Sequence, residues 1–217
     1  MTFLNVAIMV GILLAAMVAS MLYYGSRGKK QIRHLFDGLA SAMGGGVAQQ
    51  NRMHYPHWTT QVAGRPAELF FYLSEGHRKT ADIVYLVLAT PIRLPSASLV
   101  VEEGFFTTAP DKGSFNAVAG DYLAGLMPGR YVYATDEAAT VALFARGGLA
   151  ERLEPLGRYP NIVLGPDAIT VGKPYGGALD LTPERIGQDL AALAALAAHL
   201  ETVAAPPADA PPVLARG

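Results

Sequence analysis

The chain of 217 residues contains no cysteine, a single tryptophan and few charged residues. Without cysteine it can form no disulfide, no thiolate metal site and no cysteine nucleophile, and such a composition suits a cytoplasmic domain. The charges nearly balance, with 17 Lys and Arg against 18 Asp and Glu. Four of the cations lie within residues 27–33, so the rest of the chain carries 17 − 4 = 13 cations against 18 acids, a net charge of −5. That balance leaves no basic stripe for phosphates, and we expect no nucleic acid partner.

Sequence motifs of catalysis are missing as well. The chain has no Gly-x-Ser-x-Gly elbow, no His-Glu-x-x-His pattern, no Walker loop and no EF-hand loop. Gly172-Lys173 lacks the upstream glycine of a nucleotide loop, so we predict a turn there. We therefore expect no cofactor and favour a non-catalytic protein. Residues distant in sequence can still assemble a site, so an enzyme whose site follows no motif stays open, with Asp121 and His57 as its candidates.

A metal centre would have to be built on His54 and His57, which lie three residues apart. Zinc takes three or four ligands, and neither a cysteine nor a third histidine lies close to this pair in the sequence. Pro56, between the two histidines, favours an extended turn over a helix face. We therefore predict no metal site and assign both histidines to a surface loop or to packing within the domain.

One long apolar run stands out against these absences. Phe3 to Tyr24 contains no charged residue, and about 20 apolar residues in a helix cross the roughly 30 Å of hydrocarbon in a bilayer. We predict that residues 1–25 form a transmembrane anchor. The longest later apolar run, Ile83 to Ala89, is far too short to span a membrane. The prediction is therefore a single-pass membrane protein.

Four basic residues directly follow the apolar run: Arg27, Lys29, Lys30 and Arg33. Flanks rich in Lys and Arg stay in the cytoplasm. We therefore predict an inner (cytoplasmic) membrane protein with its N-terminus outside and its C-terminal domain in the cytoplasm. The same four side chains are placed to bind anionic lipid headgroups. The simpler interpretation, which the sequence favours, is that the cluster only fixes the topology.

Small residues recur along one stripe of the predicted anchor, at Ala7, Gly11, Ala15 and Ala19. A spacing of four places them on one helix face, where another helix can approach closely. Such a stripe also arises by chance in a membrane helix rich in alanine. We interpret it as a packing surface for other membrane protein subunits.

Residues 26–46 link the predicted anchor to the rest of the chain. Apolar residues repeat with helical spacing between Lys29 and Met43, opposite the basic side chains. This pattern predicts an amphipathic helix that lies along the headgroups or extends the anchor. Three glycines follow, Gly44 to Gly46, and they leave the backbone too free to stay helical. We predict a hinge there between membrane and domain.

Residues 47–203 are numerous enough for one domain with its own core. Runs rich in aromatic and β-branched residues predict strands, and Thr182-Pro183 predicts the start of a long helix that ends near Val203. The predicted strands are Pro66–Ser74, Ala81–Thr90, Ala97–Glu103, Arg130–Thr135, Asn161–Leu164 and Ala168–Val171, and shorter helices cover Glu137–Arg146 and the residues up to Leu156. We expect an α+β fold in which helices pack on a mixed or antiparallel sheet.

Gly120-Asp121 lies in the least regular part of the chain. The order of strands, Gly-Asp turn, strand, helix, short strands and terminal helix is similar to that of domains in uncharacterised bacterial single-pass membrane proteins. The resemblance covers roughly residues 64–201, and the chain departs from the pattern because Leu123–Met127 contains no second Asp. It implies a cytoplasmic α+β domain and no particular activity.

Residues 204–217 are rich in Ala and Pro, which predicts a disordered tail. An anchor with a packing stripe, a domain without catalytic motifs and such a tail favour an accessory or stabilising subunit of a larger membrane complex, of the respiratory or photosynthetic type. Its partners would be the membrane, other subunits and anionic lipid. The alternative is a membrane-tethered sensor or adaptor that binds a small ligand or a lipid headgroup.

Overall fold

The computed structural model describes residues 29–50, 54–73, 82–89, 94, 98–102, 116–117, 128–146 and 148–204. Among these residues, no helix has the length and the apolar character that crossing a membrane requires. The predicted anchor, residues 1–25, and nearly all of the predicted tail lie outside the described ranges and stay predictions. Gly120-Asp121, on which the resemblance rests, lies outside them as well.

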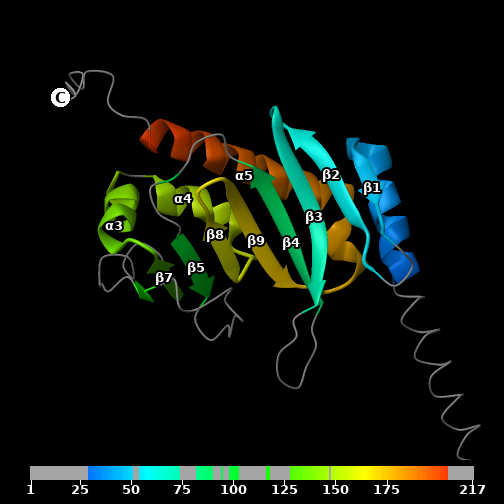
Figure 1. The fold of residues 1–217 in the computed structure, drawn as a ribbon, viewed down its shortest axis with the longest axis horizontal. Helices are drawn as coiled ribbons and strands as arrows, with labels where there is room; N and C mark the ends of the chain where they lie inside the picture. Colours follow the sequence, from blue (N-terminus) through cyan, green and yellow to red (C-terminus); the bar gives the residue numbers. More distant parts are fainter. Residues whose placement is uncertain are drawn as a thin grey trace, which may run out of the picture.

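The strands form one sheet in the order β1-β2-β3-β4-β9-β8-β5-β7-β6 (Figure 1). They are β1 (Gly46–Ala48), β2 (His57–Val62), β3 (Arg65–Leu73), β4 (Asp82–Ala89), β5 (Ser98–Glu102), β6 (Asn116–Ala117), β7 (Arg130–Ala134), β8 (Asn161–Leu164) and β9 (Ala168–Pro174). Each of these neighbouring pairs is antiparallel. The predicted α+β class with an antiparallel sheet is confirmed.

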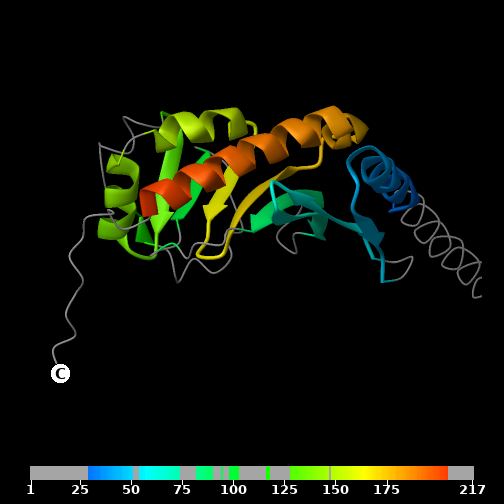
Figure 2. The same cartoon turned by 90° about the horizontal axis from the view of Figure 1, so that it is seen from above.

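The helical elements are the helix of residues 29–43, α3 (Glu137–Ala145), α4 (Leu149–Leu153), the 3-10 turns η1 (Glu154–Leu156) and η2 (Ala178–Leu181), and α5 (Pro183–Ala204). Figure 2 shows α4 and α5 along one side of the sheet, with α3 at the end of the sheet. Asp136 caps α3, because its Oδ1 accepts a hydrogen bond from the Ala139 N–H at 3.0 Å. Thr182 Oγ1 lies 3.4 Å from the Arg185 nitrogen at the start of α5, where the sequence predicts a helix start.

The core lies between the sheet and these helices. Alternate strand residues face the helices, and the strand register aligns them in a row across seven strands. The row consists of Trp58, Leu69, Leu86, Val171, Ile162, Val100 and Val132. All seven are buried, as are Leu190, Leu193 and Leu200 on the facing side of α5. The aliphatic side of α5 and this row form one continuous core.

The helix of residues 29–43 also belongs to this core. Its residues Ile32, Phe36 and Leu39 are buried in the same cluster as Trp58 and Leu69. The sheet thus covers the apolar side of the helix, and the exposed side of the helix carries the charged residues Lys30, Arg33 and Asp37.

Two features of the sheet differ from the sequence-based expectation. Strands β1 and β2 were not predicted, because β1 has three residues and β2 follows Pro56. The turn predicted at Gly172-Lys173 is wrong, because both residues lie within β9, where Gly172 is opposite Tyr85 of β4. The predicted pairings of Pro66–Ser74 with Ala81–Thr90 and across Gly165-Pro166-Asp167 are confirmed as β3-β4 and β8-β9.

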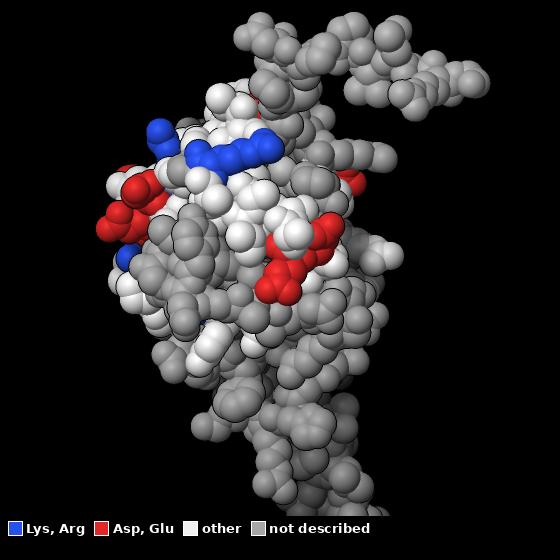
Figure 3. Space-filling view, turned by 90° about the vertical axis from the view of Figure 1, so that its left-hand side faces the viewer, with Lys and Arg blue, Asp and Glu red and all other residues white. Residues whose placement is uncertain are grey.

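The end of the molecule formed by α3 and α4 carries charges of both signs. Figure 3 shows acidic and basic side chains there in separate small groups with uncharged surface between them. The exposed charged residues of these two helices and their flanks include Asp136, Glu137, Arg146, Glu151 and Arg152. Among the residues that the structure describes, this end therefore presents no basic patch.

Candidate functional site

The predicted lipid-binding residues that the structure describes are Lys29, Lys30 and Arg33, on the helix of residues 29–43. The Lys29 ammonium lies 5.3 Å from the centre of the Tyr55 ring, and Arg33 Nη1 donates a hydrogen bond to Gln49 Oε1 at 3.1 Å. Lys30 is exposed. Arg27 and the predicted packing stripe Ala7, Gly11, Ala15 and Ala19 lie outside the described ranges.

The two histidines of the possible metal centre are not brought to a common site. His57 lies on β2, with its Nε2 3.3 Å from Glu68 Oε2 on β3 and its ring edge against Phe70. His54 is exposed. In the described part of the chain, no three His, Asp or Glu side chains gather as metal ligands do. Asp121, the other catalytic candidate, is not among the described residues.

An aromatic cluster packs beside Lys29. Phe71, near the end of β3, stacks on Tyr55 with ring centres 4.9 Å apart and contacts Phe36 at 5.9 Å. Tyr175, just after β9, meets the same Phe71 ring edge to face at 5.1 Å. The start of the helix of residues 29–43, the end of β3 and the end of β9 therefore lie together at one end of the domain. We call it the Lys29 end.

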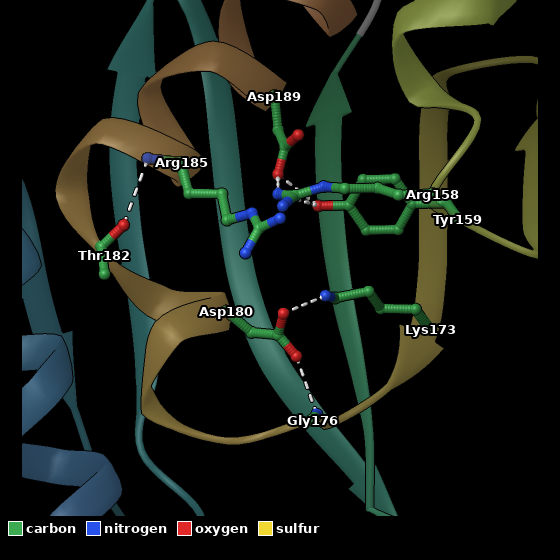
Figure 4. Close-up of polar contacts among 8 residues, drawn as sticks. All are labelled: Arg158, Tyr159, Lys173, Gly176, Asp180, Thr182, Arg185 and Asp189. Carbon is green, nitrogen blue, oxygen red and sulfur yellow. Dashed lines mark hydrogen bonds and ion pairs between the residues drawn. The ribbon is translucent and has the colours of Figure 1, made fainter.

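A second group of polar residues lies where β9, η2 and α5 meet, and we call it the ion-pair cluster. It consists of Arg158, Tyr159, Lys173, Asp180 and Asp189 (Figure 4). Asp189, on α5, is only 4% exposed and forms an ion pair with Arg158. The Tyr159 hydroxyl donates a hydrogen bond to Asp189 Oδ2 at 2.5 Å. Burial raises the pKa of the Tyr159 hydroxyl, so it stays protonated as a donor.

Asp180 of η2 is the other acid of the ion-pair cluster. It pairs with Lys173 of β9, and its Oδ2 accepts a hydrogen bond from the Gly176 N–H at 2.7 Å. Burial raises the pKa of the Asp180 carboxyl, but the bonds from Lys173 and Gly176 outweigh it and hold the pKa below its ordinary value. Both acids of the cluster therefore form ion pairs, Asp189 with Arg158 and Asp180 with Lys173. The cluster fixes η2 and the first turns of α5 to the sheet.

The sequence analysis missed the ion-pair cluster, although Asp189 carried a signal. It lies on the same helix face as Ile186 and Leu193, which are buried in the core. An acid on such a face must find a cation or hydrogen-bond donors, because an unpaired buried carboxylate is very costly. The identity of the partner, Arg158, does not follow from the sequence, because the two residues are 189 − 158 = 31 positions apart and only the folded chain brings them together.

A groove of about 530 Å³ opens at the far end of the helix of residues 29–43. It is lined by Met43, Gly45, Gly46, Thr59, Thr60, Gln61, Pro66, Ala67 and Glu68. Its lining holds hydroxyl and amide groups and one carboxylate, so it offers hydrogen bonds and no cation.

We expect acid to weaken the fold through two ion pairs. The hydrogen bond from Arg65, whose Nη2 lies 2.8 Å from Glu201 Oε2, lowers the pKa of Glu201, and the pKa of Asp180 is lowered as described above. A carboxyl group whose pKa is lower in the folded than in the unfolded chain stabilises the fold at pH values above its unfolded-state pKa of about 4. This contribution to the free energy of unfolding is lost as the pH falls through the lower, folded-state pKa. Urea unfolding of the full chain at a series of pH values, followed by Trp58 fluorescence, measures the loss. Asp180→Asn with Glu201→Gln should flatten the dependence below about pH 4, and an unchanged slope would contradict the assignment.

Comparison with family models and with curated protein sequences finds no match. Among solved structures, the crystal structure of the mycobacterial trehalose monomycolate transport factor A (TtfA) is similar, with a TM-score of 0.48 and 13% sequence identity. The match covers 74% of this chain and 95% of that one. At this identity it says nothing about what this chain binds.

Proposed function

We propose that this chain is an accessory or stabilising subunit of a larger membrane complex. In this proposal its N-terminal helix holds it in the inner membrane, and its cytoplasmic domain acts by contact with a partner subunit. The observation that carries the proposal is the outer face of the sheet, which bears aromatic side chains on the side away from the described helices.

The outer face consists of the strand residues that alternate with the core row. Phe70 stacks on Tyr85 with ring centres 5.7 Å apart, and the Phe70 ring also meets His57. Tyr85 lies over Gly172, where a Cβ atom would come within 2.7 Å of the Tyr85 ring. Tyr131, on the same face of β7, is 51% exposed. Aromatic side chains of this kind are enriched at protein interfaces, where they bury large areas at low cost in conformational entropy.

The orientation of the sheet favours a protein partner for this face. The C-terminal ends of β3 and β9 lie at the Lys29 end, which is close in sequence to the predicted anchor. With the anchor in the membrane, we propose that the outer face extends away from the membrane surface, where a neighbouring subunit can reach it. The stripe of Ala7, Gly11, Ala15 and Ala19 supplies a second contact within the bilayer.

Extraction of the full chain from native membranes in mild detergent tests the proposal. We expect a particle much larger than one or two copies of the chain, with defined partner subunits. Tyr131→Glu should reduce the yield of that particle, because it removes an exposed ring and adds a charge to the contact. A lone monomer or homodimer from wild-type membranes would overturn the proposal.

The same extraction separates the helix contact from the sheet contact. Gly11→Leu with Ala15→Leu should release the partners, because the larger side chains prevent close helix approach. Ala16→Leu is the matched control, since it lies about 140° around the helix from Gly11 and adds the same side chain. Equal particle yields from the stripe variant and the control would show that the stripe is not a contact.

The groove beside Met43 favours a sensor or adaptor as the second candidate. It lies at the end of the 15-residue helix opposite Lys29, about 20 Å along the helix axis. A ligand bound there would raise the Tm of the full chain, and Glu68→Ala in the lining should reduce that rise. Stabilisation by a small ligand of a chain that extracts without partners would favour this candidate over the subunit.

A further inference from the structure

Leu179 is the most exposed large apolar side chain in the described structure. It lies on η2 with 76% of its surface exposed, whereas Leu181, two residues later, is buried in the core. A single exposed leucine is common on protein surfaces and needs no explanation by itself. Three further observations make this one informative: how firmly its loop is held, where the loop lies, and which charges lie at the same end.

The loop that carries Leu179 is fixed on both sides. Asp180 accepts hydrogen bonds from the Lys173 ammonium and the Gly176 N–H (Figure 4). Its carboxylate therefore holds η2 to the end of β9 and to the loop that joins them. The Asp180 N–H also donates to the Gly177 carbonyl at 3.0 Å. Gly177 has a φ of +119°, a backbone conformation that favours glycine. With Asp180 and Leu181 held, Leu179 is presented outward.

The loop follows β9 and lies at the Lys29 end. Tyr175, two residues before Gly177, contacts Phe71, which stacks on Tyr55 beneath Lys29. Only residues 26–28 separate Lys29 from the predicted anchor. Four peptide links span at most about 14 Å, so the bilayer surface must lie within that distance of Lys29 if the anchor is in the membrane.

The charges at this end fit an anionic membrane surface. Lys30 and Arg33 are exposed on the helix, and Lys29 is half-buried beside Tyr55. One acid is on the same surface, because Asp37 lies 3.9 Å from Arg33. Each Lys or Arg near an anionic bilayer contributes about 1 kcal/mol of attraction. Tyr55 and Tyr175 add side chains of the type that settles between headgroups and hydrocarbon.

We infer that Leu179 inserts into the anionic lipid surface of the membrane that holds the anchor. In this inference η2 is a second membrane contact of the domain, in addition to the basic residues that follow the anchor. The inference rests on the anchored arrangement of the proposed function and adds the residue and the lipid chemistry. The basic helix attracts the headgroups, and Leu179 enters the acyl boundary. Two contacts instead of one fix the tilt of the domain, so that the outer face of the sheet keeps a defined direction toward its partner.

The absence of cysteine makes a direct test possible. Leu179→Cys in the full chain gives a single thiol for a nitroxide label, and the substitution at an exposed position leaves the core intact. Tyr131→Cys is the matched control, because it is also exposed but lies on β7, away from the Lys29 end. Both variants are reconstituted into vesicles of phosphatidylglycerol and phosphatidylcholine. Power saturation then compares the access of oxygen, which concentrates in lipid, with that of a water-soluble nickel complex.

We expect the label at position 179 to be more accessible to oxygen and less to nickel than the label at position 131. The difference should shrink in vesicles of phosphatidylcholine alone, because the cations then lose their attraction to the surface. A label at position 179 that is as accessible to nickel as the control, in a chain that sediments with anionic vesicles, overturns the lipid contact and leaves the subunit proposal standing. A chain that does not sediment with vesicles overturns both.

Extraction in detergent also distinguishes the lipid contact of Leu179 from the protein contact of the outer face. Leu179→Glu should leave the large particle intact, because the detergent has removed the bilayer, whereas Tyr131→Glu should reduce its yield. Loss of the particle with Leu179→Glu would instead make Leu179 a protein contact and overturn the lipid assignment.

Discussion

Replacing Gly45 with alanine is expected to destabilise the fold by about 2–5 kcal/mol, the sum of two effects. Gly45 has a φ of +94°, and a residue with a side chain loses about 1–2 kcal/mol in this left-handed region. A Cβ atom built at Gly45 would also lie only 2.1 Å from the Thr59 carbonyl oxygen. Because that oxygen belongs to the backbone of β2, the overlap cannot be relieved by a side-chain rotation. Forced overpacking adds about 1–3 kcal/mol.

Gly44→Ala is the matched control for this prediction. Gly44 also has a positive φ, +75°, but no atom lies within 4 Å of a Cβ built there. It should therefore lose only the backbone contribution of about 1–2 kcal/mol. Urea unfolding of the full chain in detergent micelles measures both, with far-UV circular dichroism beside the fluorescence of Trp58, the single tryptophan. Equal losses at the two positions would show that Gly45 does not approach Thr59 closely in solution.

The glycine turn shows which part of the fold the sequence predicts. Three successive glycines are enough to end the helix of residues 29–43, and local propensity gives that result. The close approach of Gly45 to β2, and the hydrogen bond from Trp58 Nε1 to the Gly44 carbonyl at 3.1 Å, join segments that are 14 residues apart. These contacts position strand β1. Its three residues are too few to show a periodic pattern, so the strand could not be predicted from the sequence.

Elements with strong local signals were predicted well. The run from Ile83 to Ala89 is apolar on both faces and forms β4, which is flanked by β3 and β9. Pro183 after Thr182 marks the start of α5, where the structure begins the helix. The ion-pair cluster was not predicted, because Asp189, Arg158 and Lys173 come from three parts of the chain that only folding brings together. The basic residues near the anchor could be singled out because they lie within seven positions of one another, and their contact with lipid stays a prediction.

Replacing Arg158 with methionine is expected to lower the free energy of unfolding by about 3 kcal/mol. Loss of one partner from a buried ion pair costs about 3–5 kcal/mol, since the other charge is left in the interior. We expect a loss at the low end of this range because the Arg158 side chain is 22% exposed, whereas the Asp189 side chain is only 5% exposed. Tyr159 still donates its hydrogen bond to Asp189, but one neutral donor does not replace a guanidinium. Arg185→Met is the control, because Arg185 is exposed at the edge of the same cluster (Figure 4) and should change stability by less than about 0.5 kcal/mol.

A triple variant identifies the cause of the loss. Arg158→Met with Asp189→Leu and Tyr159→Phe removes the cation, the anion and the hydroxyl together, so no polar group stays buried without a partner. Hydrophobic replacement of a buried ion pair is often neutral or stabilising, and most of the loss seen with Arg158→Met should be recovered. If the triple variant is as unstable as the single one, the loss comes from the packing of the Arg158 side chain and not from an uncompensated carboxylate at Asp189. Recovery would show that the ion-pair cluster is dispensable for stability, which leaves the positioning of η2 and Leu179 as the property that its charges serve.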